Sequence, residues 1–133
     1  MTKRRKLLSG AETNRRLMQQ WTFDMANSLM TEGDMTRRGA FLQAYLLRNL
    51  MEALGRGVVQ FVYETKDGER REARGTLCRG VSAAFDAYEY KQDGDMRRAN
   101  TDGLNYVYWD LDKEGFRTFS ADRLKEIIDK QQP

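Results

Sequence analysis

Histidine is absent from this chain of 133 residues, and a single cysteine, Cys78, is present. Without histidine the chain lacks the usual general base near neutral pH, so histidine-dependent triads and histidine-ligated metals are excluded. One thiol cannot form an intrachain disulfide, and a structural zinc site needs several cysteine or histidine ligands. We therefore predict no catalytic residue, no metal and no cofactor.

Long apolar runs are also missing. No run approaches the roughly 20 residues that a membrane span requires. Only Leu7 and Leu8 follow the basic tract of residues 3–6, which is too short for the apolar region of a signal peptide. The lone thiol fits a reducing compartment. We expect a cytoplasmic protein that has no membrane partner.

The positive charge is concentrated in the N-terminal third of the chain. Residues 1–57 have ten Lys or Arg and five Asp or Glu, a net charge of +5. Residues 58–78 have four of each sign, and residues 79–133 have nine basic and eleven acidic residues, a net charge of −2. This asymmetry fits an anionic partner but does not require one.

A first helix is predicted over about residues 10–30. Ser9 and Glu12 have capping-box spacing, with a hydroxyl at the cap and a carboxylate three residues on. Apolar side chains then recur with helical period until residues 32–34 interrupt the pattern. The stripe consists of Leu17, Trp21, Met25 and Leu29, with Met18, Ala26 and Met30 beside it.

A second helix is predicted over residues 37–54, with Thr36 as its N-cap. Gly55 stands where a helix commonly ends in a left-handed residue. Because the linker between the helices is short, we predict an antiparallel helical pair over residues 10–57. The broad apolar face of the second helix consists of Phe41, Leu42, Tyr45, Leu46, Leu50, Met51 and Leu54.

The rest of the chain is predicted to form strands joined by turns. Lys66-Asp67-Gly68 supplies the glycine that a tight hairpin turn requires, and Gly75 marks a bend or a close approach of the backbone. Alternation with a period of two indicates strands over residues 58–64, 69–78, 104–111 and 116–120.

Two segments have more than one interpretation. Residues 79–103 are polar and contain several glycines, which predicts a long excursion in which part of 81–91 is either a loop or an extra strand. Residues 123–129 form either a strand or a helical turn. The predicted fold is α+β, with a basic disordered tail (1–9), the helical pair, and a small antiparallel β-barrel over residues 58–130.

Three segments resemble the WYL-like Sm-type barrel proteins. They are residues 61–68 (Phe-x-Tyr-x-x-Lys-Asp-Gly), residues 71–77 (Arg-x-Ala-x-Gly-Thr-Leu) and residues 108–124, which contain Tyr-Trp-Asp-Leu and Phe-Arg-x-Phe-x-x-Asp-Arg-Leu. The resemblance implies a five-stranded barrel of the Sm or Src-homology-three kind, without catalytic activity. It points to a branch that is common in Bacteroides-type bacteria and their phages.

The better-known WYL domains are ligand-sensing modules that bind nucleic acid or nucleotides. The resemblance implies that Tyr63, Arg71 and Arg123 match the aromatic and the arginines of a WYL-type pocket. Two departures weaken this transfer. The order Tyr108-Trp109-Asp110-Leu111 replaces an uninterrupted Trp-Tyr-Leu, and the two helices do not form an obvious helix-turn-helix reader.

Basic and aromatic side chains form three groups of candidate ligand contacts, each with a structural alternative. Arginines on the second strand clamp phosphates or form a solvated strand edge. The aromatic and basic residues after 115 bind single strands or pack in the core. The N-terminal tract is a phosphate-binding arm or a solubilising tail. The candidates are Tyr63, Arg70, Arg71, Arg74, Phe116, Arg117, Arg123, Lys3, Arg4 and Arg5.

We therefore predict a non-catalytic barrel that binds nucleic acid or a nucleotide, with a regulatory or phage-related role. We expect its arginines to gather on one cationic surface. The alternative is a protein-interaction or structural module that forms a homo-oligomer through the helical pair or a barrel edge. A small enzyme is a third hypothesis, and it would have to use carboxylates, lysine, tyrosine or Cys78.

Overall fold

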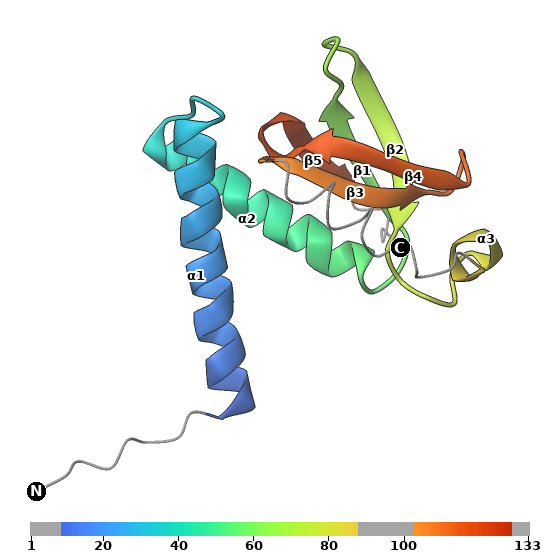
Figure 1. Ribbon diagram of the computed structural model, residues 1–133, viewed down its shortest axis with the longest axis horizontal. Helices are drawn as coiled ribbons and strands as arrows, with labels where there is room; N and C mark the ends of the chain where they lie inside the picture. The colour runs from blue at the N-terminus through green and yellow to red at the C-terminus, as the bar shows by residue number, and fades with distance from the viewer. Residues whose placement is uncertain (1–8, 88–102, 129–133) are drawn as a thin grey trace, which may run out of the picture.

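The computed structural model describes residues 9–87 and 103–128. Two long helices precede a five-stranded antiparallel sheet that coils into a small barrel (Figure 1). The α+β arrangement predicted from the sequence is therefore confirmed. Residues 1–8 of the predicted tail and residues 88–102 of the predicted excursion lie outside the described residues.

The N-termini of both long helices are capped by hydroxyl side chains. Helix α1 spans Gly10–Thr31 and helix α2 spans Arg37–Leu54. The side chains of Ser9 and Thr36 each accept a hydrogen bond from the amide three residues on, both at 3.1 Å. Each bond satisfies an amide that has no partner within the helix, and both predicted N-caps are confirmed.

The C-terminus of α2 differs from the prediction. Gly55 has a φ angle of −70° and is therefore right-handed, so the predicted left-handed cap is wrong. Its N–H still bonds to the carbonyl of Met51 at 3.2 Å, as within a helix, but the N–H of Arg56 bonds to the carbonyl of Ala53, three residues back, at 3.0 Å. The helix thus ends through a tightened last turn, which leads directly into the first strand.

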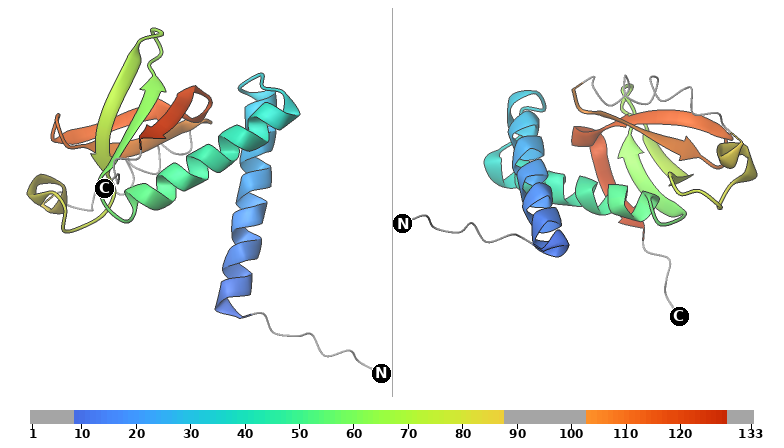
Figure 2. Two further views of the ribbon diagram at one scale, coloured as in Figure 1. Left: turned by 180° about the vertical axis from the view of Figure 1, so that it is seen from behind. Right: turned by 60° about the horizontal axis from the view of Figure 1, so that its bottom comes forward.

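The helices pack against each other through only part of their apolar faces. The buried residues of α1 all lie in its C-terminal half, and the N-terminal half extends away from the barrel (Figures 1 and 2). Leu17, Leu42 and Tyr45 belong to the predicted apolar faces, yet they are 62%, 62% and 51% exposed. The residues that are buried are Thr22, Met25, Ala26 and Leu29 in α1 and Ala40, Ala44, Leu47, Leu50 and Leu54 in α2.

The five strands follow the order β4-β3-β2-β1-β5 in one antiparallel sheet. All four predicted strands are confirmed to within two residues, and the ambiguous last segment is a strand. The strands are β1 (Val59–Glu64), β2 (Arg70–Thr76), β3 (Asn105–Asp110), β4 (Gly115–Ser120) and β5 (Leu124–Ile128).

The two outermost strands of the sheet are consecutive in the chain. The 3₁₀ helix η2 (Ala121–Arg123) joins β4 to β5 directly, so the end of β4 lies near the start of β5 and the sheet curls into a barrel. Strand β2 pairs with β1 from Arg70 to Gly75, but with β3 only at Gly75 and Thr76. The first part of β2 therefore separates from β3 and β4, which leaves one end of the barrel open.

The predicted extra strand is not present over the described start of the excursion. Residues Ala83–Asp86 form the short helix α3, and the side chain of Ser82 caps it by accepting a bond from the amide of Phe85 at 3.3 Å. Phe85 is 2% exposed and packs against Trp109, with ring centroids 5.4 Å apart. This helix covers the outer side of β3 rather than extending the sheet.

Helix α2 is bonded to the barrel from its N-terminal half and at its C-terminal end. The Gln43 side-chain amide donates to the carbonyls of Ala121 and Leu124, at 2.8 and 2.6 Å. At the other end, the Leu77 N–H donates to the Leu54 carbonyl at 2.9 Å. The helical pair therefore packs on its own barrel through α2.

Aromatic rings fill the interior of the barrel. The ring centroid of Phe61 lies 5.0 Å from that of Tyr108 and 5.7 Å from that of Phe119. Tyr63 lies 5.6 Å from Phe119. Edge and tilted contacts at these distances are favourable for aromatic pairs, so the interior is a packed core.

Gly75 is predicted to be the most sensitive glycine of the barrel. A Cβ atom at this position would lie 2.5 Å from Cδ2 of Tyr108 and 3.1 Å from the carbonyl oxygen of Trp109. We expect Gly75→Ala to lower the free energy of unfolding by about 1–3 kcal/mol, measured by urea denaturation. Gly57→Ala is the control, because nothing lies within 4 Å of its Cβ. Equal stabilities of the two variants would contradict the close approach.

Candidate anion-binding pocket

A pocket of about 360 Å³ opens at the end of the barrel where β2 separates from β3 and β4. Residues 63–67, at the end of β1 and in the following turn, form one wall. Arg71 of β2 and Arg123 of η2 face it, and Asn105 and Thr118 contribute from β3 and β4. Five elements that are distant in the sequence therefore meet around one concavity.

Arg71 and Tyr63 form a cross-strand pair at the centre of this pocket. Their Cα atoms are direct partners in the β1–β2 ladder. The Arg71 Nη1 atom donates to the Tyr63 hydroxyl at 3.4 Å, and the guanidinium carbon lies 5.9 Å from the centre of the tyrosine ring. The hydrogen bond to Tyr63 raises the pKa of Arg71 above its ordinary value, although burial acts against it.

Arg71 has no acidic partner among the described residues. Its one polar side-chain contact there is with the Tyr63 hydroxyl. A guanidinium carries five N–H donors, so most of the donors of Arg71 remain available to a ligand. Because Arg71 is charged and only half-buried, it can bind an anion from the pocket side.

Tyr63 is in turn fixed by Tyr108 of β3. Their hydroxyl oxygens are 2.8 Å apart inside the barrel, and Tyr108 is fully buried. Burial raises the pKa of Tyr108 far above its ordinary value, and the hydrogen bond with Tyr63 raises this pKa further. Tyr108 is therefore a neutral phenol near neutral pH, and core packing holds both rings in place.

Arg123 borders the pocket from η2, which leads into β5 on the other side of β1 from β2. Its Nη1 atom donates to the carbonyl of Thr65 at 2.8 Å and lies 3.8 Å from the carboxylate of Glu64. The carbonyl bond holds the arginine over the turn that follows β1. The pocket lining has Lys66, Arg71 and Arg123 against Glu64 and Asp67, a local net charge of +1.

The comparison with known protein families agrees with this architecture. The model of the WYL_2 family, described as a Sm-like SH3 β-barrel fold, matches residues 47–125. The matched range is more than half of the 133-residue chain. The chain belongs to the WYL_2 family. Comparisons with curated proteins and with solved structures give no match.

The match places the pocket within the WYL_2 barrel and α1 outside the matched range. All pocket residues lie between 63 and 123, whereas the match begins at Leu47 in the middle of α2. The predicted resemblance is thus confirmed for the family and the fold. The branch of Bacteroides-type bacteria and their phages stays a prediction.

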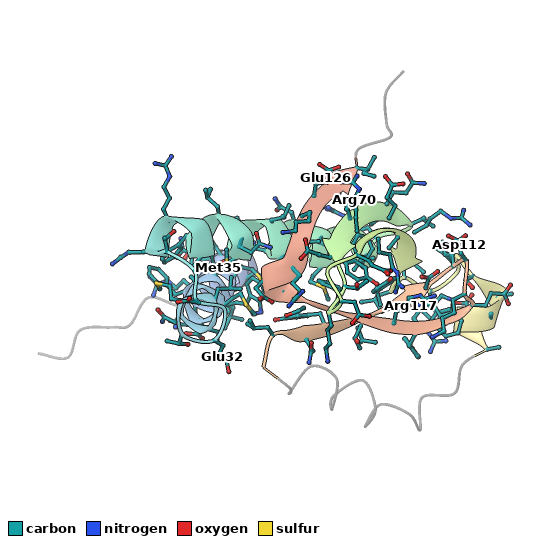
Figure 3. All side chains as sticks on the ribbon, turned by 90° about the horizontal axis from the view of Figure 1, so that it is seen from above. Glu32, Met35, Arg70, Asp112, Arg117 and Glu126 are labelled. Carbon is teal, nitrogen blue, oxygen red and sulfur yellow. The ribbon has the colours of Figure 1, made fainter. Side chains whose placement is uncertain are left out.

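The other predicted arginines of the WYL_2 barrel are not gathered around the pocket. Arg70 lies 3.3 Å from Glu72 and 3.9 Å from Glu126, next to which Figure 3 shows it. Arg74 pairs with Asp112 at 3.0 Å. The expected single cationic surface is therefore wrong for the described residues, because these exposed arginines are each paired with a carboxylate.

Arg117 and Phe116 are held by structural contacts and do not line the pocket. Arg117 Nε donates to Asp110 at 2.8 Å, and the Asp110 side chain is 8% exposed. Asp110 also accepts from the backbone amides of residues 112 and 113, so it organises the β3–β4 turn. The Phe116 ring lies 5.0 Å from Trp109. The N-terminal candidates Lys3, Arg4 and Arg5 lie outside the described residues.

The sequence analysis missed the buried partner of the pocket. Tyr108 was part of the family resemblance but was not assigned a role. The signal was the period-two spacing of Tyr106 and Tyr108, which places both on the face opposite to Val107 and Trp109. Within the described ranges, no group of three or more acidic or cysteine side chains could hold a metal ion. None of the described helices is both long and apolar enough to cross a membrane.

The raised pKa of Tyr108 predicts a specific loss of stability in alkali. The unfolded tyrosine ionises near about pH 10, while the folded one stays neutral. Its contribution to stability is therefore fully present below about pH 10 and is lost as the pH rises beyond that value. Above it, we expect the free energy of unfolding of the wild type to fall more steeply than that of Tyr108→Phe, by up to about 1.4 kcal/mol per pH unit.

Urea denaturation at several pH values between about 8 and 11 would measure this difference. Burial also raises the pKa of Tyr106, but Tyr106 is present in both proteins and its effect cancels. Parallel pH dependences of the wild type and Tyr108→Phe would contradict the described environment of Tyr108.

Proposed function

We propose that this WYL_2 barrel is a non-catalytic module that binds the phosphate group of a nucleotide or of a nucleic acid. The observation that carries the proposal is the Arg71 guanidinium, which lines a pocket and has no carboxylate partner among the described residues. Phosphate is the ligand group that such a planar, multidentate donor recognises best.

The size of the pocket favours a small ligand or a single nucleotide unit over a long strand. Its volume of about 360 Å³ is near the lower end of the roughly 300–1,000 Å³ typical of small-molecule sites. An extended single-strand site would need cations and rings in a continuous groove. Arg70, Arg74 and Arg117 do not supply one, since each is ion-paired.

The second arginine of the pocket, Arg123, supplies further donors for a phosphate. Arg123 is held over the turn by the Thr65 carbonyl, and its distance of 3.8 Å from Glu64 leaves only a weak ion pair. A phosphate between Arg71 and Arg123 would receive donors from both. We further propose a regulatory role, as the resemblance to ligand-sensing WYL domains implies, including a phage-related one.

Binding of a fluorescently labelled mononucleotide, followed by anisotropy at low salt, tests this proposal. We expect Arg71→Gln to weaken binding by about tenfold or more, because a charge-assisted hydrogen bond contributes about 1.5–3 kcal/mol. Arg74→Gln is the matched control, since Arg74 lies on the same strand but pairs with Asp112 outside the pocket. We expect it to bind as the wild type does.

The salt dependence separates a local phosphate site from a broad basic surface. With a short single-stranded oligonucleotide as the ligand and one or two of its phosphates neutralised, the logarithm of the affinity should fall with the logarithm of the salt concentration with a slope of about −1. No binding by the wild type, or equal losses in the two arginine variants, would reject the proposal. A nucleoside without phosphate should not compete with the labelled ligand.

A second candidate function, self-association, is favoured by the free half of α1. The described N-terminal half of this helix has no buried residue, and isolated helices of a few turns are marginal in water. A mostly apolar groove of about 320 Å³ runs between the helices and the barrel, lined by Met18, Trp21, Met51 and Tyr106 and by the ion pair of Arg48 and Glu52. We propose that α1 of a second copy covers this face.

Light scattering coupled to size exclusion at a concentration of about 100 μM tests self-association in the micromolar range. We expect Leu17→Glu to shift a dimer to a monomer, because Leu17 is exposed on the N-terminal half of α1, one helical turn before Trp21 of the groove. Leu42→Glu, at an equally exposed leucine of α2, should leave the dimer intact. A monomeric wild type would reject this second function without affecting the first.

A further inference from the structure

Arg71, Tyr63 and Tyr108 form a chain of polar groups that runs from the pocket into the core. The links are 3.4 Å from Arg71 Nη1 to the Tyr63 hydroxyl and 2.8 Å from there to the Tyr108 hydroxyl. Each hydroxyl has one proton, and the guanidinium can only donate. The direction of each hydrogen bond can therefore be worked out from the partners that are available.

The proton between the two tyrosines belongs to Tyr108. This side chain is 0% exposed, and its hydroxyl has no polar partner among the described residues other than the hydroxyl of Tyr63. If Tyr63 were the donor, the proton of Tyr108 would be buried without an acceptor, which is unfavourable. With Tyr108 as the donor, the proton without an acceptor is that of Tyr63, which is 2% exposed but lines the pocket, where a ligand can accept it.

The hydroxyl proton of Tyr63 can then be donated to a ligand in the pocket. The Tyr63 oxygen accepts from Tyr108 on the core side and from Arg71 on the strand side, so its own proton has no remaining partner in the described structure. Tyr63 lines the pocket together with Arg71. Tyr63 and Arg71 therefore both present hydrogen-bond donors to the pocket. Neither the Tyr63 nor the Tyr108 hydroxyl presents an acceptor there.

We propose that Tyr108 is a positioning residue that holds the Tyr63 hydroxyl as a donor, so that Tyr63 and Arg71 together bind an unprotonated oxyanion. The inference rests on the proposed function, which supplies the ligand. It adds that the protein donates, and the ligand accepts, the hydrogen bonds between them. An anionic oxygen of a phosphate or carboxylate would satisfy both donors. An amine or amide N–H at the same place would leave them facing another donor, which disfavours it.

The free protein gives a direct spectroscopic test. In an equal mixture of H₂O and D₂O, the Cζ signal of an isotope-labelled tyrosine is doubled when its hydroxyl proton exchanges slowly. We expect a doubled signal for Tyr108 and a single signal for Tyr63, assigned with the Tyr108→Phe and Tyr63→Phe variants. A doubled signal for Tyr63 in the free protein would overturn the proposed direction.

Affinity for inorganic phosphate and for a mononucleotide, measured by calorimetry, tests the ligand side. We expect Tyr63→Phe to weaken both by about tenfold and Tyr108→Phe to weaken both by about two- to fivefold, since a polarised chain of hydrogen bonds is lost. In the Tyr63→Phe background, Tyr108→Phe should have no further effect on affinity. If Tyr108→Phe reduced affinity equally in the wild type and in Tyr63→Phe, Tyr108 would have only a structural role. That result would overturn the inference.

Tyr106→Phe is the matched control, because Tyr106 lies on the same strand, is half-buried and does not line this pocket. We expect it to leave both affinities unchanged. Phosphate binding by the wild type together with a doubled Tyr63 signal would overturn this inference but leave the proposed function standing. Absence of both phosphate and mononucleotide binding by the wild type would overturn both.

Discussion

The buried contact between the hydroxyls of Tyr63 and Tyr108 links the core of this protein to its pocket. It joins β1 to β3 across the barrel interior, where these strands are not neighbours in the sheet. Its geometry depends on Gly75, since a side chain there would collide with the Tyr108 ring. The same contact fixes the ring over which Arg71 lies. Core packing thus determines where the pocket presents its charge.

Ion pairing distinguishes the exposed arginines Arg70 and Arg74 from Arg71, which is available to a ligand. Exposed pairs such as those of Arg70 and Arg74 contribute only about 0–1 kcal/mol each, but they neutralise the charge that would attract a strand of nucleic acid. Arg71 is one residue from Arg70, yet strand alternation turns it toward the pocket. Arg70 is therefore paired with a carboxylate, whereas Arg71, one residue later, is bonded to the phenol of Tyr63.

The sequence predicted the elements better than their burial. Helix caps and strand limits follow from local patterns, and Ser9, Thr36 and Gly75 were interpreted correctly. Leu17 and Leu42 were not, because an apolar stripe shows which face of a helix can be covered and not whether a partner covers it. Tyr63, Arg71 and Arg123 came together as the family resemblance implied. Tyr108 was missed because its role depends on a contact with Tyr63 in a distant strand. Periodicity shows on which face of its strand Tyr108 lies, but not which side chain it meets there.

The account depends on one claim, that an anion binds where Arg71 and Tyr63 meet and not on the paired arginines outside. Mapping of amide chemical shifts by NMR during titration with adenosine monophosphate tests this claim most directly. The account predicts that saturable shifts concentrate on residues 63–67, on Arg71 and on residues 118–123. Saturable shifts centred instead on Arg70, Arg74 and Asp112, with residues 63–67 unchanged, would contradict it.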